Sequence, residues 1–161
     1  MSQTRNRLIA ALMPAFCLMI LLALPQPSMA QGVKREILPP TWEAKFSFSP
    51  AVITQGGKVV WLAGQVGFID DNGKALKGDF DAQVRQTFKN VQRVMEKAGG
   101  SLNDLVSMTV FVSDGRYALR FTELRKEFWP KDYPASTLIV AAGFALPEIM
   151  VEVTGYAVLD K

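Results

Sequence analysis

The sequence predicts an α+β fold: a single domain in which two helices pack on one face of a mixed β-sheet, in the order ββαβαββ. Two observations support this prediction. Apolar residues recur at helical spacing in two segments. In the segments around them, apolar residues either alternate with polar ones or form short continuous runs, as they do in strands. The 161-residue chain also has no internal repeat, low-complexity stretch or linker that would divide it into further globular domains.

The first thirty residues have the pattern of a secretory signal peptide and are not counted toward this domain. Arg5 and Arg7 precede an apolar stretch, and Ser28-Met29-Ala30 places small residues where a signal peptidase cuts. The apolar stretch is shorter than the roughly 20 residues of a spanning helix; an uncleaved N-terminal anchor is the alternative. We therefore predict a signal peptide at residues 1–30, export to a periplasm or the outside of the cell, and a domain at residues 31–161.

Cleavage after Ala30 changes both the charge and the available chemistry. The formal net charge falls from +3 to +1, because 16 of the 18 basic residues and all 15 acidic residues remain. The only cysteine, Cys17, is removed, and the chain has no histidine. These absences exclude disulfides, Cys nucleophiles, Ser-His pairs and zinc sites with nitrogen or sulfur ligands. We expect no metal, no cofactor, no nucleic-acid partner and, after cleavage, no membrane partner.

The first part of the domain is predicted to be extended and to end in a tight turn. Residues 31–50, with Phe46 and Phe48 in alternation, indicate a partly extended lead-in. The run 58–63 is rich in β-forming residues and would be buried on both faces if it is central in the sheet. The segment 70–73, Asp-Asp-Asn-Gly, indicates a solvated turn rather than a pair of metal-binding acids.

Two helices follow from the apolar spacing. The first begins after Asp79, a candidate N-cap, and ends at Gly99-Gly100. The second is predicted from Tyr117 to Phe128, before Pro130. The apolar stripe of the first helix consists of Phe80, Val84, Phe88, Val91 and Met95.

Three further strands complete the predicted domain. They are expected at residues 105–113, 137–142 and 149–158. In the first of these, strict alternation places Leu105 on the face opposite Met108. In the last, alternation places Glu152 on one face with Met150, Thr154 and Tyr156.

Five segments also form a series that resembles one known family. The chain carries Ala63-Gly64-Gln65-Val66, then the helical run 82–91, the strand 105–114, the run Tyr133–Val140 and finally Leu146–Val153. In order and spacing these resemble the Rid family (YjgF/YER057c/UK114, reactive intermediate deaminases), with one short insertion within 141–145. The resemblance covers nearly all of residues 31–161. It implies a chorismate-mutase-like fold, a homotrimer with small-molecule clefts between subunits, no cofactor, and a deaminase that hydrolyses small imines or enamines.

The resemblance also assigns candidate site residues. The cleft of the deaminating relatives contains a glutamate, a glycine, an arginine, a tyrosine and an asparagine. Glu152 and Gly64 fall at the glutamate and glycine positions, whereas Ser136, Ala51 and Thr122 fall at the other three. Glu152 is therefore the catalytic candidate, which would position or activate a water molecule. Gly64, Ser136, Thr122 and Ala51 are the substrate-binding candidates.

Serine at position 136 puts the substrate of the relatives in doubt. A guanidinium holds a carboxylate through two charge-assisted hydrogen bonds, worth roughly 1.5–3 kcal/mol each, and one hydroxyl does not replace them. We therefore expect a substrate without that carboxylate: a small imine, enamine or carbonyl-like compound. Arg116, Arg120 and Arg125 lie on the second predicted helix and could supply a charge, but nothing in the sequence places them in the cleft.

Several alternatives stay open, including whether the chain is an enzyme. Glu152 can be read as a hydrogen-bonded interface carboxylate, and Ser136 as a structural serine. The fold can serve as a non-catalytic small-molecule binding module. RNA cleavage, an activity attached to some relatives, is disfavoured by the near-neutral charge and the lack of histidine. A surface or envelope interaction protein would fit an uncleaved N-terminus. Trp42, Trp61 and Trp129 are expected in the core or an interface.

Overall fold

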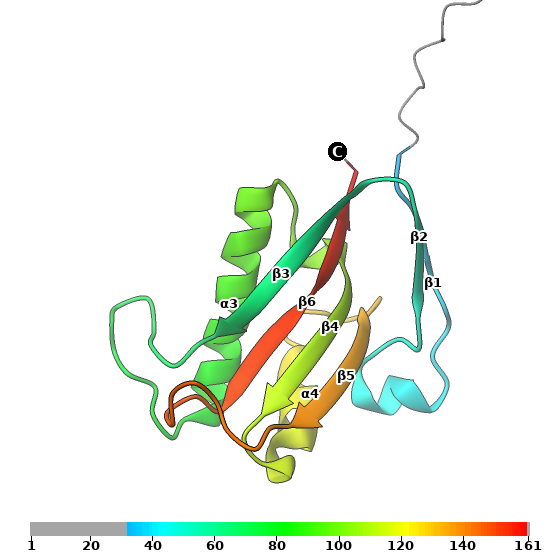
Figure 1. Ribbon diagram of the computed structural model, residues 1–161. Coiled ribbons are helices and arrows are strands. Elements are labelled where there is room, and N and C mark those ends of the chain that lie inside the picture. Colours follow the sequence, from blue (N-terminus) through cyan, green and yellow to red (C-terminus); the bar gives the residue numbers. More distant parts are fainter. Residues whose placement is uncertain (1–31, 161) are drawn as a thin grey trace, which may run out of the picture. The chain divides into compact units, whose positions relative to one another are not determined.

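A four-stranded mixed sheet forms the centre of the domain (Figure 1). The computed structural model describes residues 32–160, so the predicted signal peptide lies outside the described residues. The strand order is β3-β6-β4-β5; β6 is antiparallel to both of its neighbours, and β4 is parallel to β5. The predicted α+β class with a mixed sheet is confirmed. The four strands are β3 (Lys58–Val66), β4 (Leu105–Val112), β5 (Ala135–Val140) and β6 (Val151–Leu159).

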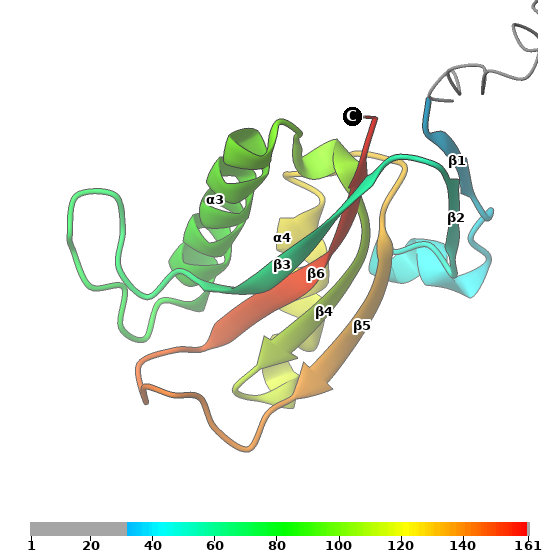
Figure 2. The ribbon, with the colours of Figure 1, turned by 45° about the horizontal axis from the view of Figure 1, so that its top comes forward.

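Both α-helices cover one face of this sheet and leave the other face open (Figure 2). They are α3 (Phe80–Ala98) and α4 (Ala118–Arg125), and the short 3-10 turns η2 (Leu102–Asp104) and η3 (Gly115–Tyr117) precede β4 and α4. The Asp79 side chain accepts a hydrogen bond from the Ala82 amide (2.9 Å), as predicted for an N-cap. Neither helix in this part of the chain has the length and hydrophobicity needed to cross a bilayer.

The core lies between α3, α4 and the covered face of the sheet. The predicted stripe of α3 is fully buried there, against apolar residues from the strands. The Phe88 ring lies at the centre of an aromatic group, with centroids 4.7–5.7 Å from those of Phe121, Phe128 and Trp129. Trp129 is therefore a core aromatic, and this aromatic group joins α3 to α4.

The lead-in is partly extended, as predicted, but its extended part is β1 (Lys34–Ile37) and not the segment around Phe46 and Phe48. It forms a two-stranded antiparallel sheet, β1 and β2 (Val52–Gln55), separated by the 3-10 turn η1 (Trp42–Phe46). The expected alternation of Phe46 and Phe48 as a strand was wrong. Both rings instead make edge contacts with Trp42, at centroid distances of 6.0 and 5.5 Å. This aromatic packing favours the turn, and the described order gains one strand relative to the prediction.

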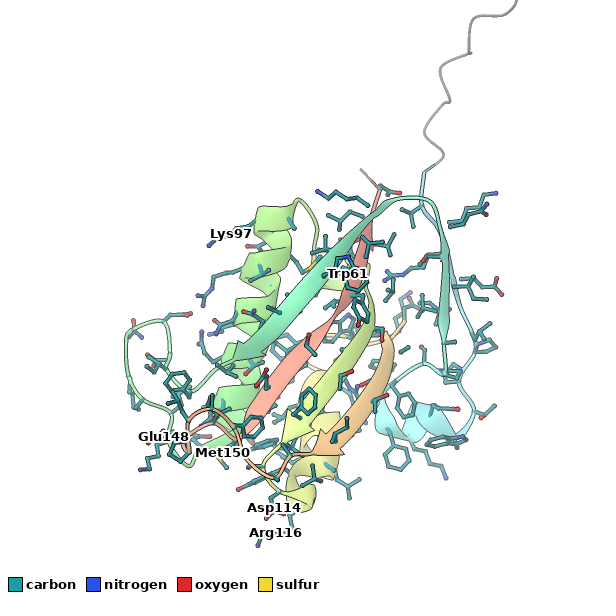
Figure 3. All side chains as sticks on the ribbon, viewed as in Figure 1. Trp61, Lys97, Asp114, Arg116, Glu148 and Met150 are labelled. Carbon is teal, nitrogen blue, oxygen red and sulfur yellow. The ribbon has the colours of Figure 1, made fainter. Side chains whose placement is uncertain are left out.

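One prediction about strand faces was wrong, and the condition attached to another is not met. The run 58–63 is an edge strand and not a central one, so burial on both faces does not apply to it, because β3 pairs only with β6 in the four-stranded sheet. Its Trp61 is 76% exposed and lies on the open face of β3 (Figure 3). Leu105 is buried with Met108, because an irregularity in the β4–β6 register between Leu105 and Ser107 breaks strict alternation.

Gly155 on β6 provides a test of this packing. An added Cβ would overlap the backbone carbonyl of Ser107 on β4, which cannot move without disturbing the strand pairing. Gly155→Ala is therefore expected to lower the free energy of unfolding by about 1–3 kcal/mol, as measured by urea denaturation.

Gly143→Ala is the matched control, because no heavy atom lies within 4 Å of its added Cβ. We expect its effect to stay within about 0.5 kcal/mol. Equal stability of the two variants would contradict the close approach of β4 and β6 at Gly155.

Candidate functional site

Glu152 and Gly64 lie side by side on the open face of the sheet. The pleat of β6 directs Val151 and Val153 into the core and Glu152 to the opposite face. In β3, the register with β6 shifts between Leu62 and Gln65, which places Gly64 in an irregular part of the strand. An added Cβ at Gly64 would overlap the Glu152 carboxylate. Glycine at this position therefore leaves the space that the carboxylate occupies.

A pocket of about 340 Å³, here called the Glu152 pocket, borders this carboxylate. No hydrogen bond or ion pair within residues 32–160 engages the Glu152 side chain, so its oxygens remain available to accept hydrogen bonds from a water or ligand. The wall opposite the sheet comes from the β5–β6 loop, which contains the segment 141–145 where the resemblance predicts an insertion. The lining residues are Phe111, Ala141, Gly143, Phe144, Ala145 and Glu152.

Buried Gln83 holds the loop that leads into β6. Its Nε2 donates to the carbonyls of Leu76 (3.0 Å) and Glu148 (2.8 Å), and its Oε1 accepts from the Met150 amide (2.9 Å). Every polar atom of this fully buried side chain is thus hydrogen-bonded. Gln83 fixes the loop two residues before Glu152, and the helical stripe alone did not predict this role.

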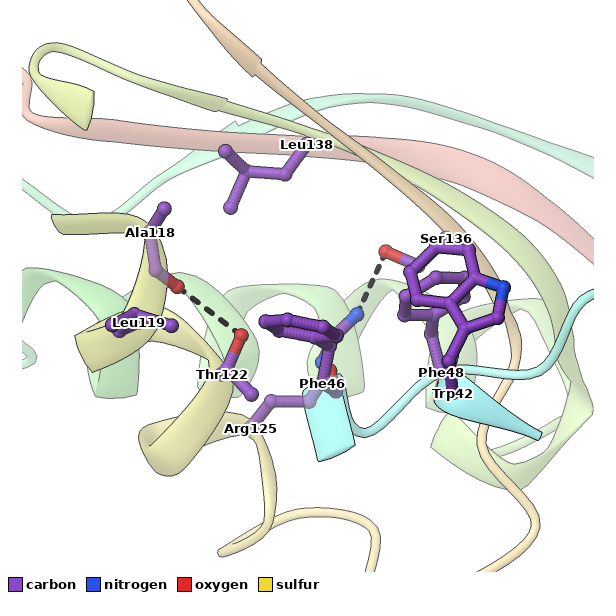
Figure 4. Close-up of a pocket in the computed structure, with 9 residues that line it drawn as sticks. All are labelled: Trp42, Phe46, Phe48, Ala118, Leu119, Thr122, Arg125, Ser136 and Leu138. Atoms are coloured by element: carbon purple, nitrogen blue, oxygen red, sulfur yellow. Dashed lines mark hydrogen bonds between the residues drawn. The ribbon is translucent and has the colours of Figure 1, made fainter. Parts of the chain in front are cut away.

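A second pocket, of about 250 Å³, lies between α4, η1 and the edge strand β5 (Figure 4). Ser136 and Leu138 of β5 face α4 at its rim, and Thr122 of α4 lies across from them. We call it the Arg125 pocket. Its lining residues are Trp42, Phe46, Phe48, Ala118, Leu119, Thr122, Arg125, Ser136 and Leu138.

Arg125 brings a guanidinium to Ser136. Its Nη1 donates to the Ser136 hydroxyl (2.7 Å), and its Nη2 donates to the carbonyl of Phe46 (2.7 Å) (Figure 4). Burial lowers the pKa of Arg125 to about 10, which leaves it protonated at neutral pH. The sequence named Arg125 among three arginines, and only the fold shows that it reaches this position.

The other two arginines of that group are engaged elsewhere. Arg116 pairs with Asp114 at the surface, and the Arg116 guanidinium lowers the pKa of that carboxyl to about 2. Arg120 pairs with Asp81 on α3 and with Glu123 on α4. Neither one lines the Arg125 pocket.

The remaining two candidates differ in placement. Thr122 lines the Arg125 pocket, but its hydroxyl donates to the Ala118 carbonyl (3.1 Å), so only its lone pairs are free for a ligand. Ala51 precedes β2, where its carbonyl accepts from the Leu38 amide (3.1 Å), and it is not among the residues that line the pocket. Phe46 and Phe48 supply the aromatic wall there instead.

One chain does not bring the two pockets together. Ser136 faces α4 on the covered side of the sheet, whereas Glu152 lies on the open side. A single cleft that uses both groups therefore needs a second copy of the chain. Within residues 32–160, no cluster of three acidic, histidine or cysteine side chains could hold a metal ion.

Comparison with family models identifies the family of this chain, and the matched region contains both pockets. The model of the family described as Endoribonuclease L-PSP matches residues 40–159, which includes every element of both pockets. The chain belongs to this family, also known as the Rid family. The predicted resemblance is therefore confirmed.

Individual relatives agree at the level of family and fold. A RutC family protein of Pyrococcus abyssi is 30% identical over 83 residues, which is 52% of this chain and 65% of that protein. The Rid-family protein YyfB of Yersinia pestis superposes with a TM-score of 0.69 at 26% identity, over 78% of this chain and 98% of that one. RidA of the Antarctic bacterium Psychrobacter sp. PAMC 21119 gives a TM-score of 0.58 at 27% identity, over 80% and 99%.

Proposed function

We propose that this Rid-family protein hydrolyses a small imine, enamine or carbonyl-like metabolite in clefts between the subunits of a homotrimer. In each cleft, the Glu152 pocket of one subunit meets the Arg125 pocket of its neighbour. The observation that carries the proposal is the Glu152 carboxylate beside Gly64, on an open face, with no hydrogen-bond or ion-pair partner in residues 32–160. An unengaged carboxylate in a pocket can orient and deprotonate water.

The chemistry needs only groups that these pockets contain. The Glu152 carboxylate accepts a proton from water as the water oxygen bonds to the carbon of a C=N group. The nitrogen takes up this proton from Glu152 and then the proton of the added hydroxyl, the C–N bond breaks, and an amine or ammonia leaves while the carbon becomes a carbonyl. The apolar walls of both pockets would exclude other water from the reacting carbon.

Glu152→Gln separates an enzyme from a non-catalytic binding module. In an enzyme, loss of the proton acceptor should lower the rate at least about 100-fold, whereas affinity should change much less. The measurement is hydrolysis of freshly generated 2-iminopropanoate and 2-iminobutanoate, and of neutral imines, by the purified protein and by this variant.

Gly64→Ala and Ser136→Arg are the companion variants. Gly64→Ala pushes the carboxylate aside without removing it, so it should lower the rate while leaving the fold intact. Ser136→Arg restores the residue of the deaminating relatives. Unchanged turnover by Glu152→Gln would refute the role of Glu152, and ligand binding without any turnover would favour the binding module.

The open face of the sheet supports the proposed trimer. Exposed apolar side chains of three strands gather there, and the ring of Trp61 makes an edge contact with Tyr156 at 5.0 Å. A monomer rarely exposes such a patch to water, and closed symmetric oligomers bury it. The members are Val59, Trp61, Ile139 and Tyr156.

Trp61→Lys should therefore dissociate the trimer, because it places a charge on this patch. Analytical ultracentrifugation is expected to show a trimer for the natural protein and monomers for the variant. Ile69→Lys, which changes an exposed residue of the loop after β3, is the control and should remain trimeric. A natural protein that sediments as a monomer would refute the inter-subunit cleft.

We also propose that the protein is exported and cleaved after Ala30. The support is the sequence pattern of residues 1–30 and the position of the family match, which begins at residue 40. Intact mass of the protein isolated from its native cells should correspond to residues 31–161. A mass that includes residues 1–30 would indicate an N-terminal anchor and favour an envelope interaction protein.

RNA cleavage, which the family description names, has less support in this chain. Residues 31–161 carry a net charge of +1. Binding to the phosphate backbone depends on clustered basic groups. In the described residues, Arg85, Arg93, Arg116 and Arg120 are each paired with an acidic side chain.

A further inference from the structure

A third pocket lies between β1 and the connection from α4 to β5, and we call it the Arg35 pocket. It has a volume of about 450 Å³. Its lining residues are Arg35 and Ile37 of β1, Asn103 of η2, Phe128, and residues 130–132. None of them lines the Glu152 pocket or the Arg125 pocket. A ligand of this pocket would therefore be held by residues outside the candidate site.

The Arg35 pocket is also distant from Glu152 within one chain. Its Asn103 comes just before Leu105, the first residue of β4, whereas Phe111 of the Glu152 pocket lies near the last residue of that strand. A strand rises about 3.3 Å per residue, so six residues of β4 span roughly 20 Å. A small molecule bound in the Arg35 pocket does not reach the Glu152 carboxylate of the same chain.

The guanidinium of Arg35 is held in a fixed orientation. Its Nη1 donates to the Asn103 carbonyl, and its Nη2 donates to the Leu105 carbonyl (2.5 Å). Both acceptors are neutral, and no acidic side chain in the described part of the chain forms an ion pair with Arg35. Partial burial lowers the pKa of Arg35, and the carboxylates of Asp104 and Asp132 oppose this shift. Three of its five N–H donors remain for a ligand.

Asp132 brings a negative charge to the same pocket. Its carboxylate is near enough to Arg35 to act on it electrostatically, but the two side chains do not form an ion pair. Asp132 pairs instead with its neighbour Lys131, at 3.8 Å, and both of these side chains are exposed. A long, exposed ion pair contributes little, so a ligand can replace it. Opposite charges thus line one pocket without meeting.

The charges and the other walls indicate the class of ligand. Asp132 would repel a simple anion, and Arg35 with Lys131 would repel a simple cation. Three further lining residues, Ile37, Phe128 and Pro130, are apolar. The volume suits a small molecule. A ligand that matches these walls carries a positive and a negative group close together, beside an apolar body.

We propose that the Arg35 pocket binds an α-amino acid with an apolar side chain. The carboxylate of the ligand would bind Arg35, and its ammonium group would bind Asp132. All three parts of such a molecule leave one carbon atom, so the side chain can lie against Phe128 while both charges are paired. This site does not depend on the proposed hydrolysis, because it shares no residue with the pockets of Glu152 and Arg125.

The test compares leucine with molecules that each lack one of its groups. Isothermal titration calorimetry with the purified protein would use L-leucine, 4-methylpentanoate, which lacks the ammonium group, and 3-methylbutylamine, which lacks the carboxylate. Leucine should bind at least about tenfold more tightly than either analogue, as expected for one charge-assisted hydrogen bond. Glycine, which lacks the apolar body, should also bind more weakly than leucine.

Two variants assign the two charges. Arg35→Gln should remove the advantage of leucine over 3-methylbutylamine, and Asp132→Asn should remove its advantage over 4-methylpentanoate. Asparagine accepts the left-handed backbone of Asp132 (φ 55°), so this variant should fold even if Arg35→Gln does not. Lys34→Gln is the matched control: it removes a cation from the preceding residue of β1, which does not line the pocket, and should leave leucine binding unchanged.

Glu152→Gln should also bind leucine like the natural protein, whatever its turnover, which separates failure of the proposed reaction from failure of this inference. Three outcomes would overturn the inference. They are an analogue that binds as tightly as leucine, including no binding of any of them at millimolar concentration; a leucine affinity that a folded Arg35→Gln or Asp132→Asn variant leaves unchanged; and loss of leucine binding in Glu152→Gln, which would place the ligand at the Glu152 pocket.

Discussion

The antiparallel pairing of β6 with both β3 and β4 is the constraint on which the rest of the structure depends. It places β6 in the interior of the sheet, where Val151 and Val153 are fully buried under the helices. Because side chains alternate along a strand, the same pairing forces Glu152 onto the open face. A shift of one residue would bury the carboxylate and expose the valines. The position of Glu152 is thus fixed by the core rather than by contacts of its own.

The sheet also explains why the candidate site is divided. Strand β5 is an edge strand, and Ser136 faces α4 from it, whereas Glu152 faces away from both helices. Backbone hydrogen bonds make the sheet a rigid barrier between the two groups. In the proposed homotrimer, a second subunit would bring the two groups together around one ligand, and the apolar open face would be the surface on which subunits associate. Assembly and ligand binding would therefore be consequences of the same exposed face.

Features set by local periodicity could be predicted from the sequence, and features set by distant contacts could not. The stripe of α3 and the alternation of β6 each follow from spacing within one element, and both were correct. The edge position of β3 depends on which strands pair, and the burial of Leu105 depends on an irregular register with β6. The sequence named Arg125 as one possible charge, but its contact with Ser136 spans 11 residues and requires α4 to pack beside β5.

In both pockets of the candidate site the charged group lies on a regular element, and one wall comes from an irregular segment. Glu152 and Arg125 belong to a strand and a helix whose positions are fixed by the core. The facing walls are the β5–β6 loop and the aromatic turn η1. Loops tolerate changes of length and residue type far better than a packed sheet does. Ligand choice can therefore change through these walls while the charges stay in place. In this chain those walls include residues of the loop 141–145 and the rings of Trp42, Phe46 and Phe48.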